Sequence, residues 1–216
     1  SRTSGNLWGS SYDISGAEYL PGCVTDPSGR FLYLTQMVSN NIRVYTIGTS
    51  SWGELTEQTT ATATGGDPVS ISVDPSGRFA YSANYAGLDV SVFTIDQSTG
   101  ELTGPASVSM GHAVRSVVIH PSGSFAYVRY EDSSLPVYAI DQDSGALTAG
   151  PALTTTSVPE DSVIDPSGRF LYMANRDSGI IRVYTINADT GALAASSTVD
   201  TGTANLKQLT ILGTME

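Results

Sequence analysis

The stretch Asp165-Pro166-Ser167-Gly168-Arg169-Phe170 decides the fold, because the chain contains four versions of it. The other versions begin at Asp26, Asp74 and His120, so the copies follow one another at intervals of 48, 46 and 45 residues. Proline presets the backbone for a turn and glycine takes the left-handed position, so each copy predicts a tight connection between two strands. A period of about 46 residues indicates a repeat architecture.

Two further patterns keep the same phase. Gly-x-Leu recurs with its leucines at positions 7, 55, 102, 147 and 193, and an aromatic residue followed two places later by Ile recurs at 45, 93, 138 and 184. Each repeat contains an apolar strand before the turn, a second strand that begins with Phe, a third with two-residue alternation and a fourth rich in Ser and Thr. Four strands in each long repeat predict an all-β fold, a β-propeller of four-stranded antiparallel blades.

We expect a single propeller domain over residues 1–216. Its complete blades span approximately residues 22–62, 68–110, 114–156 and 159–201, and orphan strands lie at 5–14 and 205–213. The orphans either form a reduced fifth blade that closes the ring or leave it open; we favour closure because it removes unpaired strand edges. Pro136 lies inside a third strand, where it predicts a bulge or a weakened pair, since proline donates no ladder hydrogen bond.

The repeat resembles that of the seven-bladed lactonase-type propellers, also called YVTN repeats. The resemblance rests on residues 165–175 and continues through Ile181-Arg182-Val183-Tyr184-Thr185-Ile186 and Asp189-Thr190-Gly191-Ala192-Leu193. Proteins with such repeats include 6-phosphogluconolactonase-like enzymes, a muconate-lactonising enzyme and surface-layer proteins, so the resemblance implies the blade and leaves the activity open. Seven blades would need roughly 320 residues, whereas this chain has 216.

The composition narrows the classes of partner. The formal net charge is −11 and the pI about 4.4, which disfavours binding to nucleic acid. The scarcity of charged residues, 14% of the chain, together with abundant Ser, Thr and Gly favours an extracellular or cell-surface location. The sequence contains no run of 18 apolar residues, so it predicts no membrane-spanning helix. The single cysteine, Cys23, occupies an apolar strand position, so we expect it to be buried.

Candidate chemistry lies where each inner strand begins, at the mouth of the axial channel. Arg115, Glu160 and Lys207 occupy equivalent positions in successive repeats, and His112 lies just upstream. A catalytic interpretation gives His112 or Glu160 the role of general base, while Arg115 and Lys207 hold a carboxylate or lactone carbonyl. The alternative is a ring of ion pairs at a solvated channel mouth. The next residue of each repeat adds possible ligand-binding side chains: Ser70, Ser116, Asp161 and Gln208.

Metal and cofactor chemistry have no support in the sequence. The second histidine, His120, replaces the turn aspartate at the other end of its strand, so it is too far from His112 to share a metal and we expect a structural role. No histidine or cysteine cluster has metal-ligand spacing, and no glycine-rich phosphate loop is present. We therefore expect neither a metal nor a cofactor.

Two functions stay open. We favour a non-catalytic extracellular binding or assembly module, which associates with itself through exposed strand edges or binds a small ligand at the channel mouth. The alternative is a lactonase-like hydrolase that acts on a sugar lactone or a related carboxylate at the channel mouth. An assay of lactone opening distinguishes the two functions. The hydrolase predicts turnover that is lost in Arg115→Ala or Glu160→Ala variants, whereas the binding module predicts no turnover.

Overall fold

The computed structural model describes residues 22–50, 53–58, 62–155, 159–175, 178–202, 206 and 208–211. Within these ranges every regular element is a strand. The strands are, in chain order, β1 (Cys23–Thr25), β2 (Phe31–Gln36), β3 (Asn41–Ile47), β4 (Leu55–Glu57), β5 (Thr62–Ala63), β6 (Pro68–Val73), β7 (Phe79–Asn84), β8 (Asp89–Ile95), β9 (Leu102–Ser109), β10 (Val114–Ile119), β11 (Phe125–Tyr130), β12 (Ser134–Ile140), β13 (Leu147–Thr154), β14 (Pro159–Ile164), β15 (Phe170–Asn175), β16 (Ile180–Ile186) and β17 (Leu193–Asp200).

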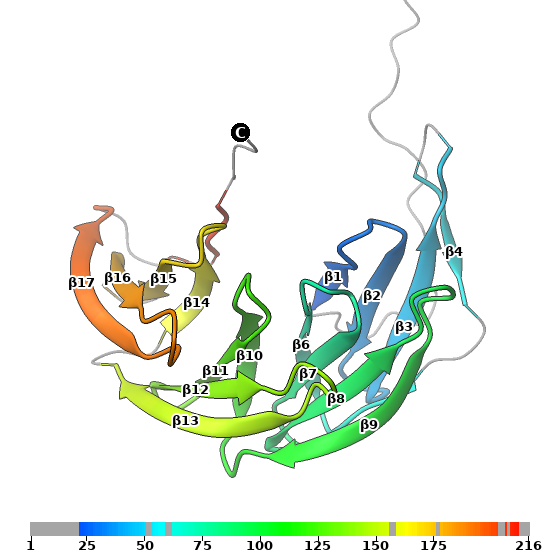
Figure 1. Ribbon diagram of the computed structural model, residues 1–216, viewed down its shortest axis with the longest axis horizontal. Coiled ribbons are helices and arrows are strands. Elements are labelled where there is room, and N and C mark those ends of the chain that lie inside the picture. The colour runs from blue at the N-terminus through cyan, green and yellow to red at the C-terminus, as the bar shows by residue number, and fades with distance from the viewer. Residues whose placement is uncertain are drawn as a thin grey trace, which may run out of the picture.

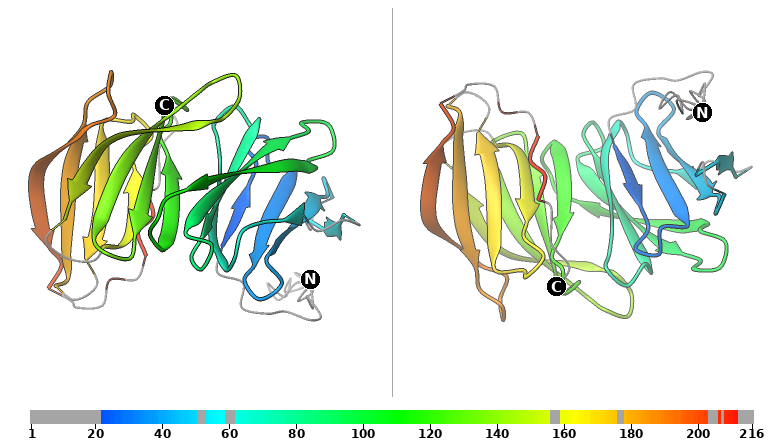
Figure 2. Two further views of the ribbon diagram at one scale, coloured as in Figure 1. Left: turned by 90° about the horizontal axis from the view of Figure 1, so that it is seen from below. Right: turned by 90° about the horizontal axis from the view of Figure 1, so that it is seen from above.

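The strands form four antiparallel sheets, one for each repeat, which confirms the predicted blades. Three sheets have the simple orders β6-β7-β8-β9, β10-β11-β12-β13 and β14-β15-β16-β17. In the first blade, β4 and β5 both pair with β3, so its outer strand is interrupted. The blades stand side by side along an arc, with β1, β6, β10 and β14 on its inside and β9, β13 and β17 on its outside (Figures 1 and 2).

The repeated turn is held by its aspartate. In the second blade, Oδ1 of Asp74 accepts hydrogen bonds from the N–H groups of Arg78 and Phe79, both at 2.8 Å, and Oδ2 accepts one from the N–H of Ser76 at 3.1 Å. Gly77 completes the turn with φ of +70°. The carboxylate thus satisfies backbone donors that the tight connection leaves unpaired, which explains why the motif recurs.

The third blade uses His120 in place of the aspartate. Its Nε2 lies 2.8 Å from the carbonyl oxygen of Gly168 in the fourth blade, and its Nδ1 accepts a hydrogen bond from the N–H of Ser122 at 3.1 Å. The side chain is buried. His120 therefore has the structural role that the sequence predicted, and it also joins two blades.

The hydrophobic core lies between the blades. One cluster joins the first and second blades through residues such as Tyr33 and Phe93, another joins the second and third through Tyr81 and Val117, and the last joins the third and fourth. Burial of apolar area against the neighbouring blade is the main stabilising contribution to such a repeat structure.

The prediction that Cys23 is buried was wrong. Cys23 is exposed, whereas the equivalent residues Ile71 and Val117 have exposed fractions of 5% and 2%. Those two residues pack against the blade that precedes theirs. No described blade precedes β1, so the same strand position faces no packed partner in the first blade.

Pro136 weakens its pair as predicted. The β11–β12 register covers three residues of each strand, from Phe125 to Tyr127 on β11, whereas β7 and β8 pair over six. The pairing stops at Val137, next to the proline, because Pro136 has no N–H to donate. As a result the ends of β11 and β12 nearest the inner rim are released from regular ladder pairing.

The orphan strands fall mostly beyond the described residues. The strand expected at 5–14 lies wholly outside them. Of the strand expected at 205–213, residues 206 and 208–211 are described and form no strand. In the described part of the chain no helix is long and apolar enough to cross a membrane.

Candidate functional site

Two of the rim positions identified from the sequence, Arg115 and Glu160, are β-bulges, and so is Val69, their equivalent in the second blade. The register shifts by one residue at Val69 in the β6–β7 pair, at Arg115 in β10–β11 and at Glu160 in β14–β15. A bulge leaves its extra residue outside the ladder and redirects the side chain, a device common beside active sites. Equivalent bulges therefore place one extra side chain at the start of each of three successive inner strands. Two of these side chains, Arg115 and Glu160, are charged.

Arg115 contacts the second and third blades. Its Nε donates a hydrogen bond to Glu131, which directly follows β11, and its guanidinium carbon lies 4.5 Å from the ring centroid of Tyr85, which directly follows β7. The hydrogen bond to Glu131 raises the pKa of Arg115, and the charge of Glu160 in the fourth blade acts in the same direction. Arg115 is thus a fixed cation, with four guanidinium donors besides Nε–H.

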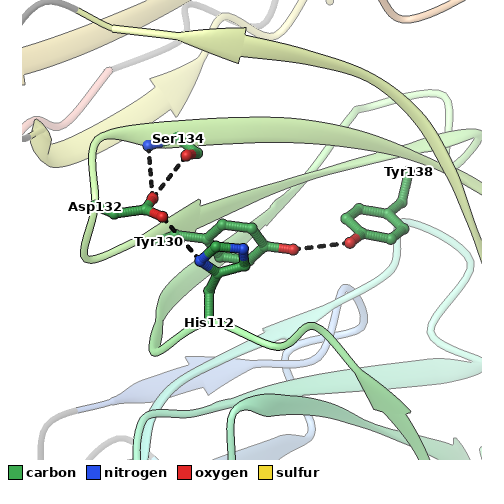
Figure 3. Close-up of polar contacts among 5 residues, drawn as sticks. All are labelled: His112, Tyr130, Asp132, Ser134 and Tyr138. Atoms are coloured by element: carbon green, nitrogen blue, oxygen red, sulfur yellow. Dashed lines mark hydrogen bonds and ion pairs between the residues drawn. The ribbon is translucent and has the colours of Figure 1, made fainter.

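His112 and Asp132 form a pair on the same blade (Figure 3). Nδ1 of His112 lies 2.8 Å from Oδ2 of Asp132, and the imidazole stacks on Tyr130 with ring centroids 4.8 Å apart and planes inclined by 11°. Nε2 of His112 has no hydrogen-bond partner among the described residues. A carboxylate that accepts from Nδ1–H leaves Nε2 as the basic nitrogen, the arrangement of a histidine general base.

Asp132 is itself held in place. Its Oδ1 accepts hydrogen bonds from Oγ of Ser134 at 2.6 Å and from the N–H of Ser134 at 3.1 Å. The hydrogen bond from the Ser134 hydroxyl lowers the pKa of Asp132 below its ordinary value, and the charge of His112 has a smaller effect in the same direction. The hydroxyl groups of Tyr130 and Tyr138 lie 2.8 Å apart and fix the ring beneath the imidazole (Figure 3). The pair is therefore preorganised although both partners are about half exposed.

Arg129 is a second cation at the rim, and it was not among the residues predicted from the sequence. Its Nε donates to Oγ of Ser116 at 3.1 Å and its Nη1 to the carbonyl oxygen of Pro159 in the fourth blade at 2.8 Å. Burial lowers the pKa of Arg129 to about 10, and the charge of Asp161 opposes this effect. The sequence does distinguish this position, because Arg129 is a large cation where the other blades have the small residues Thr35, Ala83 and Ala174.

The remaining predicted residues divide into two groups. Ser116 and Asp161 belong to the rim cluster: Ser116 accepts from Arg129, and Oδ2 of Asp161 accepts from the N–H of Leu209 at 2.7 Å. Ser70 lies on β6 against the first blade, beside Gly22, and Gln208 is exposed; no described contact joins either to the cluster. Lys207 lies outside the described residues.

Among the described residues, no group of three His, Cys, Asp or Glu side chains is arranged to hold a metal ion. The rim instead contains the His112–Asp132 pair, the Arg115–Glu131 pair and Arg129. Such a set can accept a proton from water and stabilise a developing oxyanion.

Comparison with known proteins identifies relatives of the chain. A family model described as lactonase, seven-bladed β-propeller, matches residues 11–117 and 105–206. The candidate 6-phosphogluconolactonase of Bacteroides fragilis has 23% identity and a TM-score of 0.75 over 89% of this chain and 58% of its own. The periplasmic gluconolactonase of Pseudomonas aeruginosa has 21% identity and a TM-score of 0.72 over 88% and 56%. No curated protein matches.

These likenesses to solved structures are too distant to show more than the fold, and the chain spans little more than half the length of those proteins. The family match nevertheless favours the hydrolase over the non-catalytic module that the sequence analysis preferred. That prediction was wrong. In the folded chain the rim also contains Arg129, Glu131 and Asp132, which come from the second strand and the turn after it.

Proposed function

The chain belongs to the family of seven-bladed β-propeller lactonases, and on that premise we propose that it is a hydrolase that opens sugar lactones at the rim of the third blade. The observation that carries the proposal is the His112–Asp132 pair, with the guanidinium of Arg115 three residues along the chain from the histidine. Hydrolysis of a lactone needs a base for water and a positive group for the carbonyl oxygen, and the rim supplies both types.

The reaction follows from these groups. Nε2 of His112 accepts a proton from water as the water oxygen attacks the lactone carbonyl carbon. The carbonyl oxygen becomes an oxyanion, which the free guanidinium donors of Arg115 stabilise. The ring carbon–oxygen bond then breaks, and the protonated imidazole returns the proton to the departing ring oxygen. The product is an open-chain hydroxy acid, so one water is consumed and no other reactant is needed.

Asp132 is a positioning residue in this scheme. Its carboxylate keeps the proton of His112 on Nδ1 and stabilises the imidazolium that forms during the attack. Arg129, held between Ser116 and Pro159, adds positive potential that favours an acidic lactone and its carboxylate product, despite the overall charge of −11.

The test measures ring opening of glucono-δ-lactone and its 6-phosphate by proton release, above the spontaneous rate. We expect His112→Gln to lower kcat by about 10²- to 10⁴-fold, the usual contribution of a general base. Asp132→Asn should reduce kcat with little change in KM, because it alters the tautomer and not the binding of substrate. Asp143→Asn, an equal change of charge at an exposed turn on the same blade, should leave the rate unchanged.

Catalysis absent from the wild-type chain on both lactones would refute the proposal. Retention of full activity by both His112→Gln and Asp132→Asn would refute the assignment of the base.

A further inference from the structure

The third blade departs from its repeat at three positions that are linked to one another in the second blade. In the second blade these positions hold Thr64, Asn84 and Ser91. The amide of Asn84 accepts a hydrogen bond from Oγ1 of Thr64 at 3.0 Å and donates one to Oγ of Ser91 at 2.8 Å. Asn84 and Ser91 are buried. This network therefore fastens the connection that enters the second blade, which contains Thr64, to the second and third strands of that blade.

The third blade has Met110, Tyr130 and Pro136 at the same three positions. The backbone confirms the equivalence of Met110 and Thr64, because each N–H donates to the carbonyl oxygen of the last residue before the third strand of the preceding blade. The side chains of Met110 and Pro136 carry no N–H or hydroxyl group, so the network of the second blade cannot form. Met110 and Tyr130 belong instead to the hydrophobic cluster between the second and third blades.

The ring of Tyr130 lies beneath His112 (Figure 3). The two rings are inclined by only 11° and their centroids are 4.8 Å apart. The hydroxyl of Tyr130 lies 2.8 Å from that of Tyr138, which holds the far end of the ring. Pro136 ends the regular pairing of β11 with β12 before Tyr130 is reached, so that pairing does not fix the position of the tyrosine. The third blade thus has an aromatic platform where the second blade has a hydrogen-bonded amide.

This platform restricts the imidazole in a way that Asp132 does not. The contact between Nδ1 and Asp132 fixes one atom of the ring, and the ring can still turn about that contact. Stacking on Tyr130 fixes the plane of the ring, so the two contacts together set the direction of Nε2. Burial raises the pKa of Tyr130, and its hydrogen bond with Tyr138 acts in the same direction, so the hydroxyl keeps its proton and is not itself a base.

We propose that Tyr130 is a positioning residue for lactone opening that acts through His112, and that Met110 and Pro136 are the changes that allow a tyrosine at this position. The proposal deepens the function proposed above and rests on it. It also accounts for the location of the base in the third blade, because the other blades have an amide at the position of Tyr130: Gln36, Asn84 and Asn175. In the second blade, moreover, Gly66 stands at the position of His112.

The experiment compares Tyr130→Leu, which removes the aromatic ring, with Tyr130→Phe, which keeps it. We expect Tyr130→Leu to lower kcat for the opening of glucono-δ-lactone by about 10- to 100-fold, because a misdirected base is inefficient, with KM within about twofold of wild type. Tyr130→Phe should keep a kcat close to that of wild type. Tyr184→Leu removes a buried tyrosine from the fourth blade and should leave kcat unchanged, so it controls for a general loss of stability.

Nuclear magnetic resonance gives a readout that needs no catalysis. The chain has two histidines, so the imidazole C–H signals of His112 are identified by their loss in His112→Gln, and those of the buried His120 serve as a reference. The ring current of the stacked side chain should displace the His112 signals in wild type and in Tyr130→Phe. This displacement should disappear in Tyr130→Leu and persist in Tyr184→Leu.

A second variant restores the residue types of the second blade. Met110→Thr, Tyr130→Asn and Pro136→Ser together supply the side chains of a network that already exists in this fold, so we expect the triple variant to be folded. It lacks the platform, so kcat and the displacement of the His112 signals should fall as they do in Tyr130→Leu. Far-ultraviolet circular dichroism checks the folding of each variant.

The outcomes separate this proposal from the function on which it rests. A wild-type kcat in a folded variant that lacks the ring, or unchanged His112 signals in that variant, overturns the role of Tyr130 and leaves lactone hydrolysis standing. A wild-type chain that opens neither lactone refutes the proposed function, and the role of Tyr130 in catalysis with it.

Discussion

Removal of one hydroxyl group tests whether the hydrogen bond from a buried tyrosine to a glycine carbonyl of the next blade holds the blades together. Tyr81 is fully buried and donates to the Gly145 carbonyl at 3.0 Å. Tyr81→Phe keeps the ring and its packing but leaves that carbonyl without its donor. An unsatisfied buried acceptor costs about 1–3 kcal/mol, which corresponds to a roughly 5- to 150-fold smaller equilibrium constant for folding.

The chain provides its own control for this substitution. Tyr172→Phe removes the same atom from a half-buried tyrosine whose hydroxyl has no described partner, so it should change the free energy of unfolding by less than about 0.5 kcal/mol. Urea unfolding followed by fluorescence and by circular dichroism gives the free energy if the two transitions coincide.

Two outcomes would refute the reasoning. If Tyr81→Phe unfolds at the urea concentration of its parent, the interblade hydrogen bond contributes nothing to stability. If Tyr172→Phe is as destabilising as Tyr81→Phe, the loss does not come from the hydrogen bond that distinguishes the two positions.

Two further predictions concern the turns and the response to pH. Gly100→Ala should lower the free energy of unfolding in urea by about 2–4 kcal/mol, because the φ of Gly100 is +78° and the new methyl group would lie 2.4 Å from the ring of Phe31 in the preceding blade. Gly29→Ala should lower it by only about 1–2 kcal/mol, because Gly29 has a similar φ but open space around it. Equal losses for the two variants would contradict this prediction. Although burial raises the pKa of Asp26, hydrogen bonds led by that of the Ser28 hydroxyl lower it overall, so the stability that this carboxylate confers should be complete above pH 3.8 and decline below it. Burial raises the pKa of Tyr81, so stability should also decline as pH rises above 10.0; thermal melts across both windows measure the two effects, and a melting temperature that is constant through either would contradict the corresponding assignment.

The sequence predicted the blades because their determinants are local. The Asp-Pro-Ser-Gly turn supplies its own carboxylate to the backbone donors around it, so residues 74–79 specify the hairpin without help from the rest of the chain. The effect of Pro136 was predictable for the same reason, since a missing N–H weakens its pair in any sheet. Arg129 could also have been found, by comparison with Ala83 and Ala174 at the same repeat position.

Other features depend on which surfaces meet. Cys23 was predicted to be buried from its place in the repeat, but burial at that position comes from the preceding blade, which the strand itself does not encode. The sequence also did not predict the partners of the rim residues. Glu131 and Asp132 follow β11 in an irregular turn, and no regular spacing along the chain relates them to Arg115 and His112.

The sequence by itself therefore determined the unit of this protein, a four-stranded blade repeated four times with charged residues at the start of its inner strands. Local turn chemistry and two-residue alternation are sufficient for that, because they act within a few residues. Only the tertiary structure decided how the rim is assembled and which side chains of neighbouring blades meet. Those properties arise where strands of different blades approach each other, and a side chain's partner there is set by packing across the sheet faces and not by distance along the chain.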